Sequence, residues 1–168
     1  MILYASQRGR SAELALHLLN GDENDHVTVH DIRGFVSEGL AEALREAYAM
    51  SRGTRCKQFL FSLSLNPPEY ADVPIEEFEA AIEEIEKRLA LVGQPRIIVF
   101  HEKNGRRHCH CIWSRIDADK LVAVRMSHFK RKLMDVSRLL FVKYGWKMPK
   151  GMEKGQARSR LHLTREEY

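Results

Sequence analysis

RIIVFHEKNGRRHCHCIWSRI, residues 96–116, is the stretch of sequence that predicts a fold most directly. Two segments rich in apolar residues, 96–102 and 107–116, flank the tetrapeptide KNGR. Asn-Gly between such segments is a strong short-range signal for a β-hairpin, because both residues accept the positive φ angles of a tight two-residue turn. The sequence therefore predicts two antiparallel strands that turn at Asn104-Gly105.

Three histidines lie on this predicted hairpin, His101 on the first strand and His108 and His110 on the second. Side chains alternate between the two faces of a strand, so His108 and His110 share a face, and the turn folds His101 back toward them. Three imidazoles that leave coordination positions open are typical of a catalytic metal site. We therefore predict that they bind one metal ion. The alternative is that histidines on an edge strand only form hydrogen bonds.

The rest of the chain predicts helices and strands around this hairpin. Residues 57–68 alternate apolar and polar side chains up to a Pro-Pro pair, which predicts a strand. The clearest helix, 75–91, has one apolar face and six glutamates, at positions 76, 77, 79, 83, 84 and 86, that we assign to its outer face. This order predicts an α+β fold with a central, mainly antiparallel sheet flanked by helices. Further predicted elements are a strand at 1–6, a helix at 11–20 with Ser11 as N-cap, an extended segment at 25–34, a helix at 37–50, a second hairpin at 117–126 and a helix at 128–144.

The charge of the chain is divided unevenly along its length. Residues 1–95 carry 9 Lys and Arg against 16 Asp and Glu, a difference of −7, whereas residues 96–168 carry 18 against 7, a difference of +11. A basic half that contains a histidine cluster favours a polyanionic partner, and nucleic acid is the first candidate. The alternative is that these cations only solvate surface helices.

Length and cysteine content define the class of protein. A chain of 168 residues is long enough for one domain, which we place at 1–148, followed at 149–168 by a basic extension or the start of a linker. No apolar run approaches the ~20 residues of a membrane span, so we expect no membrane insertion. The three cysteines show no disulfide-like spacing, which suits the reducing cytoplasm.

The three histidines and their surroundings resemble a known family. Six residues separate His101 from His108, and one residue separates His108 from His110. This spacing is similar to the metal motif of relaxases, the mobilization nucleases of the HUH endonuclease superfamily. VFHEKNGRRHCHCIWSRID (99–117) and FLFSLSLNPP (59–68) also resemble relaxase segments. The resemblance implies a five-stranded antiparallel sandwich and a divalent metal on the three histidines. It points to Mn or Mg, while imidazole ligands also suit Zn, Ni, Co or Fe.

The resemblance also implies an activity. Relaxases nick one strand of single-stranded or supercoiled DNA at an origin of transfer, remain linked to the 5′ phosphate, and so initiate conjugative mobilization of a plasmid. Accessory relaxosome proteins and a coupling protein are the further partners it implies. Two alternatives stay open: a nucleic-acid-binding protein of the same fold without catalysis, and a rolling-circle replication initiator with a tyrosine nucleophile.

The segment ELALHLLNGDEND, 13–25, resembles the relaxase helix that carries the nucleophile. Most relaxases have a tyrosine there, and this chain has His17, as in the branch with a histidine nucleophile. An imidazole nitrogen is nucleophilic near pH 7, whereas a tyrosine with a pKa near ~10 needs help to ionise. We therefore assign His17 as the nucleophile and Tyr4 as the alternative, and interpret Tyr48 as a packing residue.

Several other residues are candidates for supporting roles. Many relatives have an acidic residue two positions after the first histidine; this chain has Lys103 there, and Glu102 becomes the candidate for an outer-shell carboxylate. Ser62 or Ser64 is expected to face the cleft. The candidates for DNA contacts are Arg8, Arg10, Arg52, Arg55, Lys57, Arg106, Arg107 and Arg115.

Overall fold

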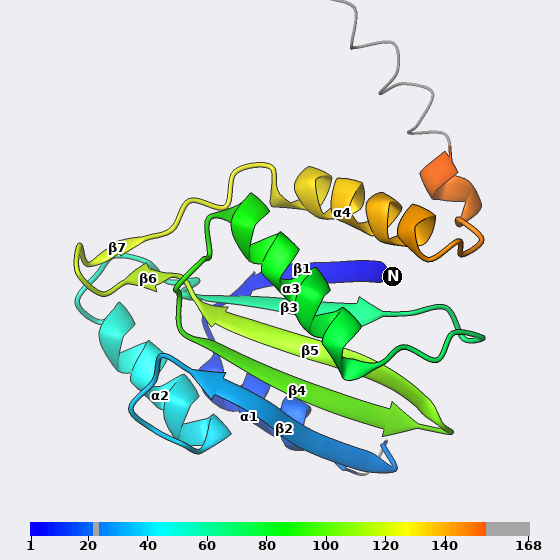
Figure 1. The fold of residues 1–168 in the computed structure, drawn as a ribbon. Helices are drawn as coiled ribbons and strands as arrows, with labels where there is room; N and C mark the ends of the chain where they lie inside the picture. The colour runs from blue at the N-terminus through cyan, green and yellow to red at the C-terminus, as the bar shows by residue number, and fades with distance from the viewer. Residues whose placement is uncertain (22–23, 154–168) are drawn as a thin grey trace, which may run out of the picture.

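The computed structural model describes residues 1–21 and 24–153, and within them five strands form one sheet in the order β1-β3-β5-β4-β2 (Figure 1). Each neighbouring pair is antiparallel. The predicted α+β class and antiparallel sheet are therefore confirmed. The strands are β1 (Ile2–Arg8), β2 (His26–Arg33), β3 (Leu60–Asn66), β4 (Arg96–Lys103) and β5 (Arg106–Ser114), and the short strands β6 (Ile116–Asp117) and β7 (Val122–Ala123) form a separate hairpin.

The predicted β4–β5 hairpin is at the centre of this sheet. Asn104 and Gly105 have φ angles of 51° and 71° at its turn, which is the pair of positive values that the Asn-Gly signal predicts. The register places His101 directly opposite His108. The hairpin is therefore confirmed in type, turn position and register.

Helices cover both faces of the sheet: α1 and α2 pack on one face, and α3 and α4 on the other (Figure 1). The four predicted helices are confirmed, with two corrections at their N-termini. Arg10 and not Ser11 is the N-cap residue of α1, and no side chain caps that helix. Helix α2 begins at Leu40, three residues after the predicted start. The helices are α1 (Ser11–Leu19), α2 (Leu40–Ser51), α3 (Ile75–Leu89) and α4 (Phe129–Lys143).

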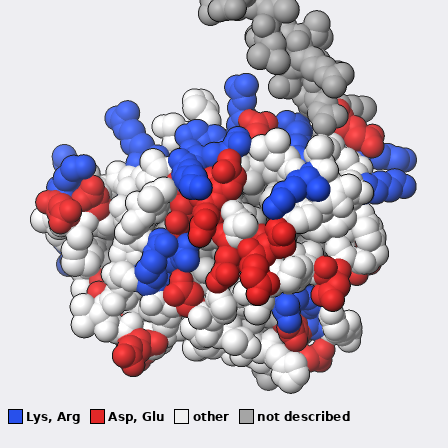
Figure 2. Space-filling model, in the orientation of Figure 1, with Lys and Arg blue, Asp and Glu red and all other residues white. Residues whose placement is uncertain are grey.

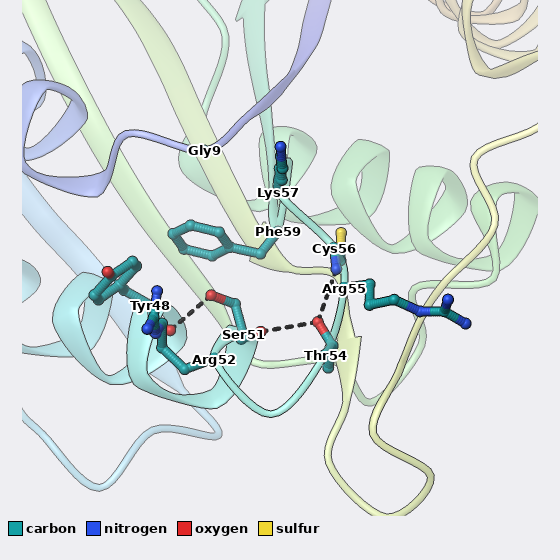
Figure 3. A pocket seen from close by; sticks show the side chains of 9 residues that line it. All are labelled: Gly9, Tyr48, Ser51, Arg52, Thr54, Arg55, Cys56, Lys57 and Phe59. Atoms are coloured by element: carbon teal, nitrogen blue, oxygen red, sulfur yellow. Dashed lines mark hydrogen bonds between the residues drawn. The ribbon is translucent and has the colours of Figure 1, made fainter.

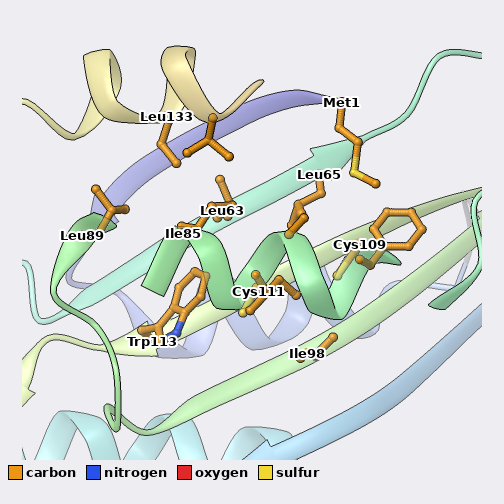
Figure 4. Close-up of a cluster of buried hydrophobic side chains, with 14 of the residues drawn as sticks. Met1, Leu63, Leu65, Ile85, Leu89, Ile98, Cys109, Cys111, Trp113 and Leu133 are labelled. Atoms are coloured by element: carbon orange, nitrogen blue, oxygen red, sulfur yellow. The ribbon is translucent and has the colours of Figure 1, made fainter. Parts of the chain in front are cut away.

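The larger hydrophobic core lies between the sheet and the pair α3 and α4 (Figure 4). Strand β5 contributes Cys109, Cys111 and Trp113, which are fully buried because strand side chains alternate between faces. Burial raises the pKa of both thiols, so Cys109 and Cys111 pack as neutral side chains. The histidines of β5 occupy the opposite face.

Glu86 of α3 is predicted to lie on the outer face of its helix, and this prediction is wrong. In the structure its side chain lies between the helix and the sheet. Its side chain is 5% exposed. Its Oε1 accepts hydrogen bonds from Arg33 of β2 (2.8 Å), Arg96 of β4 (3.0 Å) and the indole N–H of Trp113 of β5 (2.8 Å). This carboxylate therefore connects α3 to three strands. The helical pattern of the sequence does not predict this role, because an acidic residue between the apolar and the polar face of a helix looks like any other surface glutamate.

Replacing Glu86 with alanine is expected to lower the free energy of unfolding by about 3 kcal/mol, because the half-buried Arg96 loses a buried counter-charge, the more exposed Arg33 loses a partner, and the buried indole N–H of Trp113 loses its acceptor. Glu84 on the same helix is the matched control: its side chain is 43% exposed and pairs with Arg88, and its replacement should cost less than about 1 kcal/mol. Urea denaturation followed by circular dichroism measures both. Equal, small losses in the two variants would contradict a stabilising role for the Glu86 cluster.

The sheet face under α1 and α2 is only partly covered. Leu60, Ile97, Val99 and Ile112 are buried against these helices. Further along the same face the side chains become polar, and none of them is in the hydrophobic cluster. A pocket opens there, which we call the central pocket. It is lined by Tyr4, Ala5, Ser6, Arg8, Leu14, His17, Ser62, Ser64 and His110.

The packed unit continues past the predicted boundary at residue 148. Met152 is buried, and Arg138 of α4 donates a hydrogen bond to its carbonyl oxygen at 3.3 Å. Most of the predicted basic extension, residues 154–168, lies outside the described residues. None of the helices in the described part of the chain is long and apolar enough to cross a membrane.

Candidate metal centre on the open sheet face

The three predicted histidine ligands meet in the structure. His101, His108 and His110 offer ring nitrogens that all lie within 4.8 Å of one another. Their ring centroids are 4.6 Å (101–110), 5.2 Å (101–108) and 5.4 Å (108–110) apart. Two neighbouring antiparallel strands produce this cluster, because the register sets His101 opposite His108 and strand alternation adds His110 to the same face. Such a cluster could hold a metal ion.

A hydrogen bond from the first helix fixes one of the three rings. His101 is 3% exposed, and its Nε2 lies 2.8 Å from the carbonyl oxygen of Leu18 in the last turn of α1. A carbonyl oxygen only accepts, so Nε2 carries the proton and Nδ1 keeps the lone pair that a metal needs. Partners of this kind orient metal-ligating histidines. The donor chemistry of the site therefore fits a bound divalent ion.

Burial keeps the other two rings uncharged. It is the main cause that lowers the pKa of His110 to about 3, and charges on His101, His108 and His17 lower it further. Burial is also the first cause that lowers the pKa of His108, followed by charges on His101 and Arg106. Both imidazoles are therefore neutral near pH 7, which is the form that ligates metals.

The predicted nucleophile lies next to this cluster. His17 is an exposed residue of α1 whose ring centroid is 6.0 Å from that of His110, with the ring planes at 87°. The alternative, Tyr4 on β1, is 70% exposed and stands opposite Ser64, which stands opposite His110. Two strand spacings of about 4.8 Å separate its backbone from that of His110. Both side chains line the central pocket, and His17 is beside the triad.

Glu102 does not support the histidines, contrary to its predicted outer-shell role. Strand alternation puts it on the opposite face of β4 from His101. There it forms an ion pair with Arg107, its partner across the hairpin, with an Nη2–Oε1 distance of 2.6 Å. The carbonyl of Leu18 provides the hydrogen bond to His101 instead. No sequence pattern could have shown this, because any residue offers a backbone carbonyl.

Arg115 is a second correction, because its guanidinium is buried and not available to DNA. The residue is 8% exposed and donates hydrogen bonds to the side chain of Gln7 and to the carbonyl oxygens of Gln58 and Val124. Desolvation lowers its pKa. Arg115 therefore joins the ends of β1 and β3 to the segment after β7, a role that its residue type does not indicate.

The other predicted DNA contacts divide into paired and unpaired cations. Arg10 forms an ion pair with Glu13, Arg106 with Glu69 and Arg107 with Glu102. By contrast, no carboxylate within residues 1–21 and 24–153 pairs with the remaining four. The unpaired cations are Arg8, Arg52, Arg55 and Lys57.

The basic residues of the second half of the chain do not cluster around the three histidines. The exposed cations Lys130, Arg131 and Lys132 belong to α4, on the other side of the sheet from the triad. Figure 2 shows that side, with the acidic residues of α3 in a central band and Lys and Arg residues above it. The uneven charge along the sequence therefore does not translate into one basic surface.

The fold and the site together define an α+β protein with a candidate metal centre on the half-open face of an antiparallel sheet. The family model of the relaxase MobA/VirD2-like nuclease domain matches residues 12–146, a range that holds His17 and the triad, and the chain belongs to this family. Relaxase nuclease domains nick DNA for mobilization and depend on a metal, and they bind origin-of-transfer DNA. None of the curated proteins matches the chain.

Proposed function

We propose that this protein nicks one DNA strand at a specific sequence in an origin of transfer, by metal-dependent transesterification, and so initiates conjugative mobilization. The observation that carries this proposal is the position of His17 beside the histidine triad, with His17 and His110 lining one open pocket of a relaxase fold. A nucleophile and a charge-stabilising centre on either side of a scissile phosphate are what a transesterification needs.

His101, His108 and His110 would hold the divalent ion, of which Mn and Mg are our first candidates. Such an ion, when bound, would supply Lewis-acid stabilisation of the charge that develops on the phosphate. The chain itself keeps the imidazoles of His108 and His110 neutral through burial and orients His101 through the carbonyl of Leu18.

His17 would act as the nucleophile. A ring nitrogen attacks phosphorus in line, and the new N–P bond forms as the P–O3′ bond breaks. The imidazole gives up the proton of its other ring nitrogen, and the leaving oxygen takes up one proton to become a 3′ hydroxyl, so the exchange balances. The 5′ phosphate stays on the imidazole as a phosphohistidine-like adduct. Because one phosphoryl bond replaces another, the 3′ hydroxyl can reverse the step and rejoin the ends.

The unpaired cations of the open face would hold the DNA backbone. Arg8 lines the central pocket with Ser62 and Ser64, where each can meet a phosphate oxygen. Arg10 and Arg106 lie near the same face. To bind DNA, each would have to give up its ion pair with a glutamate and contact a phosphate instead. Accessory relaxosome proteins and a coupling protein would complete the assembly on supercoiled origin DNA.

Mass spectrometry of a covalent protein–oligonucleotide adduct tests the proposal. The protein is incubated with Mn²⁺ or Mg²⁺ and single-stranded DNA from the origin of the element that encodes it, and then digested. We expect an adduct on the peptide SAELALHLLNGDENDH, residues 11–26, that a chelator prevents. Tight DNA binding without an adduct would instead identify a binding protein of this fold, and an adduct on Tyr4 would move the chemistry to β1.

A further inference from the structure

A second pocket lies between the end of α2 and the beginning of β3, and it combines aromatic with cationic side chains (Figure 3). Tyr48 and Phe59 provide the aromatic surface, and Arg52, Arg55 and Lys57 provide the charge. We call it the α2–β3 pocket. Its remaining lining residues are Gly9, Ser51, Thr54 and Cys56.

Hydrogen bonds hold the turn that carries the three cations. The hydroxyl of Ser51 donates to the carbonyl of Tyr48 at 2.6 Å, that of Thr54 donates to the carbonyl of Ser51 at 2.9 Å, and the N–H of Cys56 donates to Thr54 Oγ1 at 3.0 Å (Figure 3). A Cβ at Gly9 would collide with the carbonyl oxygen of Lys57, so the ends of β1 and β3 approach as closely as only glycine allows. The fold therefore holds the lining of this pocket in a defined conformation.

The cations of this pocket differ from those of the β4–β5 turn. Arg106 and Arg107 at that turn are matched by Glu69 and Glu102. Arg52, Arg55 and Lys57 have no carboxylate partner anywhere in the described part of the chain. Three unmatched positive charges on one short turn are an electrostatic cost to the free protein, which an anionic ligand would remove.

The aromatic wall has one covered ring and one open ring. Phe59 is 2% exposed, whereas Tyr48 is 46% exposed, and their ring centroids are 5.8 Å apart at an angle of 53°. Packing on Phe59 holds Tyr48 in place and leaves part of its ring to the pocket. Proteins that bind single-stranded nucleic acids use this arrangement of a partly exposed aromatic ring beside cations. The bases stack on the aromatic rings, and the phosphates contact Arg and Lys.

The α2–β3 pocket continues the central pocket along β1. Tyr4 and Arg8 of β1 line the central pocket, and Gly9, the next residue, lines the α2–β3 pocket. At about 3.3 Å per residue, the five steps from Tyr4 to Gly9 cover roughly 17 Å. We infer, on the basis of the proposed function, that the α2–β3 pocket is a subsite for one unpaired nucleotide a few positions from the scissile phosphate, with its base on Tyr48 and its phosphates on Arg52 and Lys57.

Binding of oligothymidylates of about 4 to 16 nucleotides, the range of common single-strand sites, tests the subsite without knowledge of the origin sequence. By fluorescence anisotropy, Tyr48→Leu should weaken the affinity about tenfold, the loss of one stacked base. Tyr48→Phe is the matched control that keeps the ring, and it should bind like the wild type. Equal binding by all three proteins, or no binding by the wild type, would overturn the subsite.

Charge variants test the phosphate contacts. Arg52→Gln and Lys57→Gln should each reduce the slope of log affinity against log salt by about 1. Arg131→Gln on α4, an exposed cation on the other side of the sheet, should leave the slope unchanged. The same slope in all variants would contradict phosphate binding at this turn.

Photocrosslinking separates this inference from the proposed function. An oligonucleotide with 4-thiothymidine should crosslink to the peptide that contains Tyr48, whether or not a covalent adduct forms at His17. A crosslink at Tyr48 without any adduct would retain the subsite and reject the nicking activity. An adduct at His17 with crosslinks only to residues of the central pocket would retain the activity and reject the subsite.

Discussion

Replacing His17 with alanine is expected to abolish the covalent DNA adduct and to reduce nicking of supercoiled origin plasmid by at least about a thousandfold. The reason is geometric: the centroid of the His17 ring lies 6.0 Å from that of the His110 ring, and both rings line the central pocket, so that a phosphate bound in this pocket can be reached from the nucleophile and from the triad. Binding of the same DNA should change little, because an exposed imidazole contributes little to affinity beside several arginines. Gel analysis of relaxed plasmid measures nicking, and anisotropy measures binding.

Tyr4→Phe is the matched variant for the alternative nucleophile. It removes only the phenol oxygen from an exposed ring, so nicking should stay within about tenfold of the wild type, or 1.4 kcal/mol of activation free energy. The opposite pattern, with Tyr4→Phe inactive and His17→Ala active, would assign the chemistry to the tyrosine and favour a replication-initiator type of reaction. If neither variant lost activity, a different residue would be the nucleophile.

The sequence predicts the centre of this fold well, because local signals there agree with the tertiary structure. Asn104-Gly105 sets the turn of the β4–β5 hairpin, and a two-residue turn fixes the register of both strands. Once the register is fixed, His101 must face His108, and strand alternation must place His110 beside them. The triad could therefore be predicted from the positions of the three histidines relative to this turn.

The parts that the sequence did not predict depend on contacts between distant residues. Glu86 reads as one more glutamate of an acidic helix, yet it accepts hydrogen bonds from three strands. Arg115 reads as part of a basic cluster, yet it is buried. Leu18 reads as a core residue, which its side chain is, while its carbonyl orients His101. Residue type gives no information about such roles, because each is decided by the side of an element on which a distant partner packs.

The second large effect is expected at the metal site itself. His108→Ala should weaken binding of Mn²⁺ by more than about a hundredfold, because loss of a ligand exceeds the 10–100-fold cost of losing an outer-shell partner. Adduct formation should fall with it at metal concentrations that saturate the wild type. Isothermal titration calorimetry measures the affinity, and the adduct assay measures the consequence.

His26→Ala is the matched control for this variant, because His26 is an exposed histidine of β2 outside the triad. It should bind metal and form the adduct like the wild type. Partial recovery of the His108→Ala adduct at high Mn²⁺ would show that the remaining two histidines still position the ion. If His108→Ala bound Mn²⁺ as tightly as the control, the triad would not be the metal site, and the three clustered imidazoles would have to be explained as hydrogen-bonding partners of the DNA.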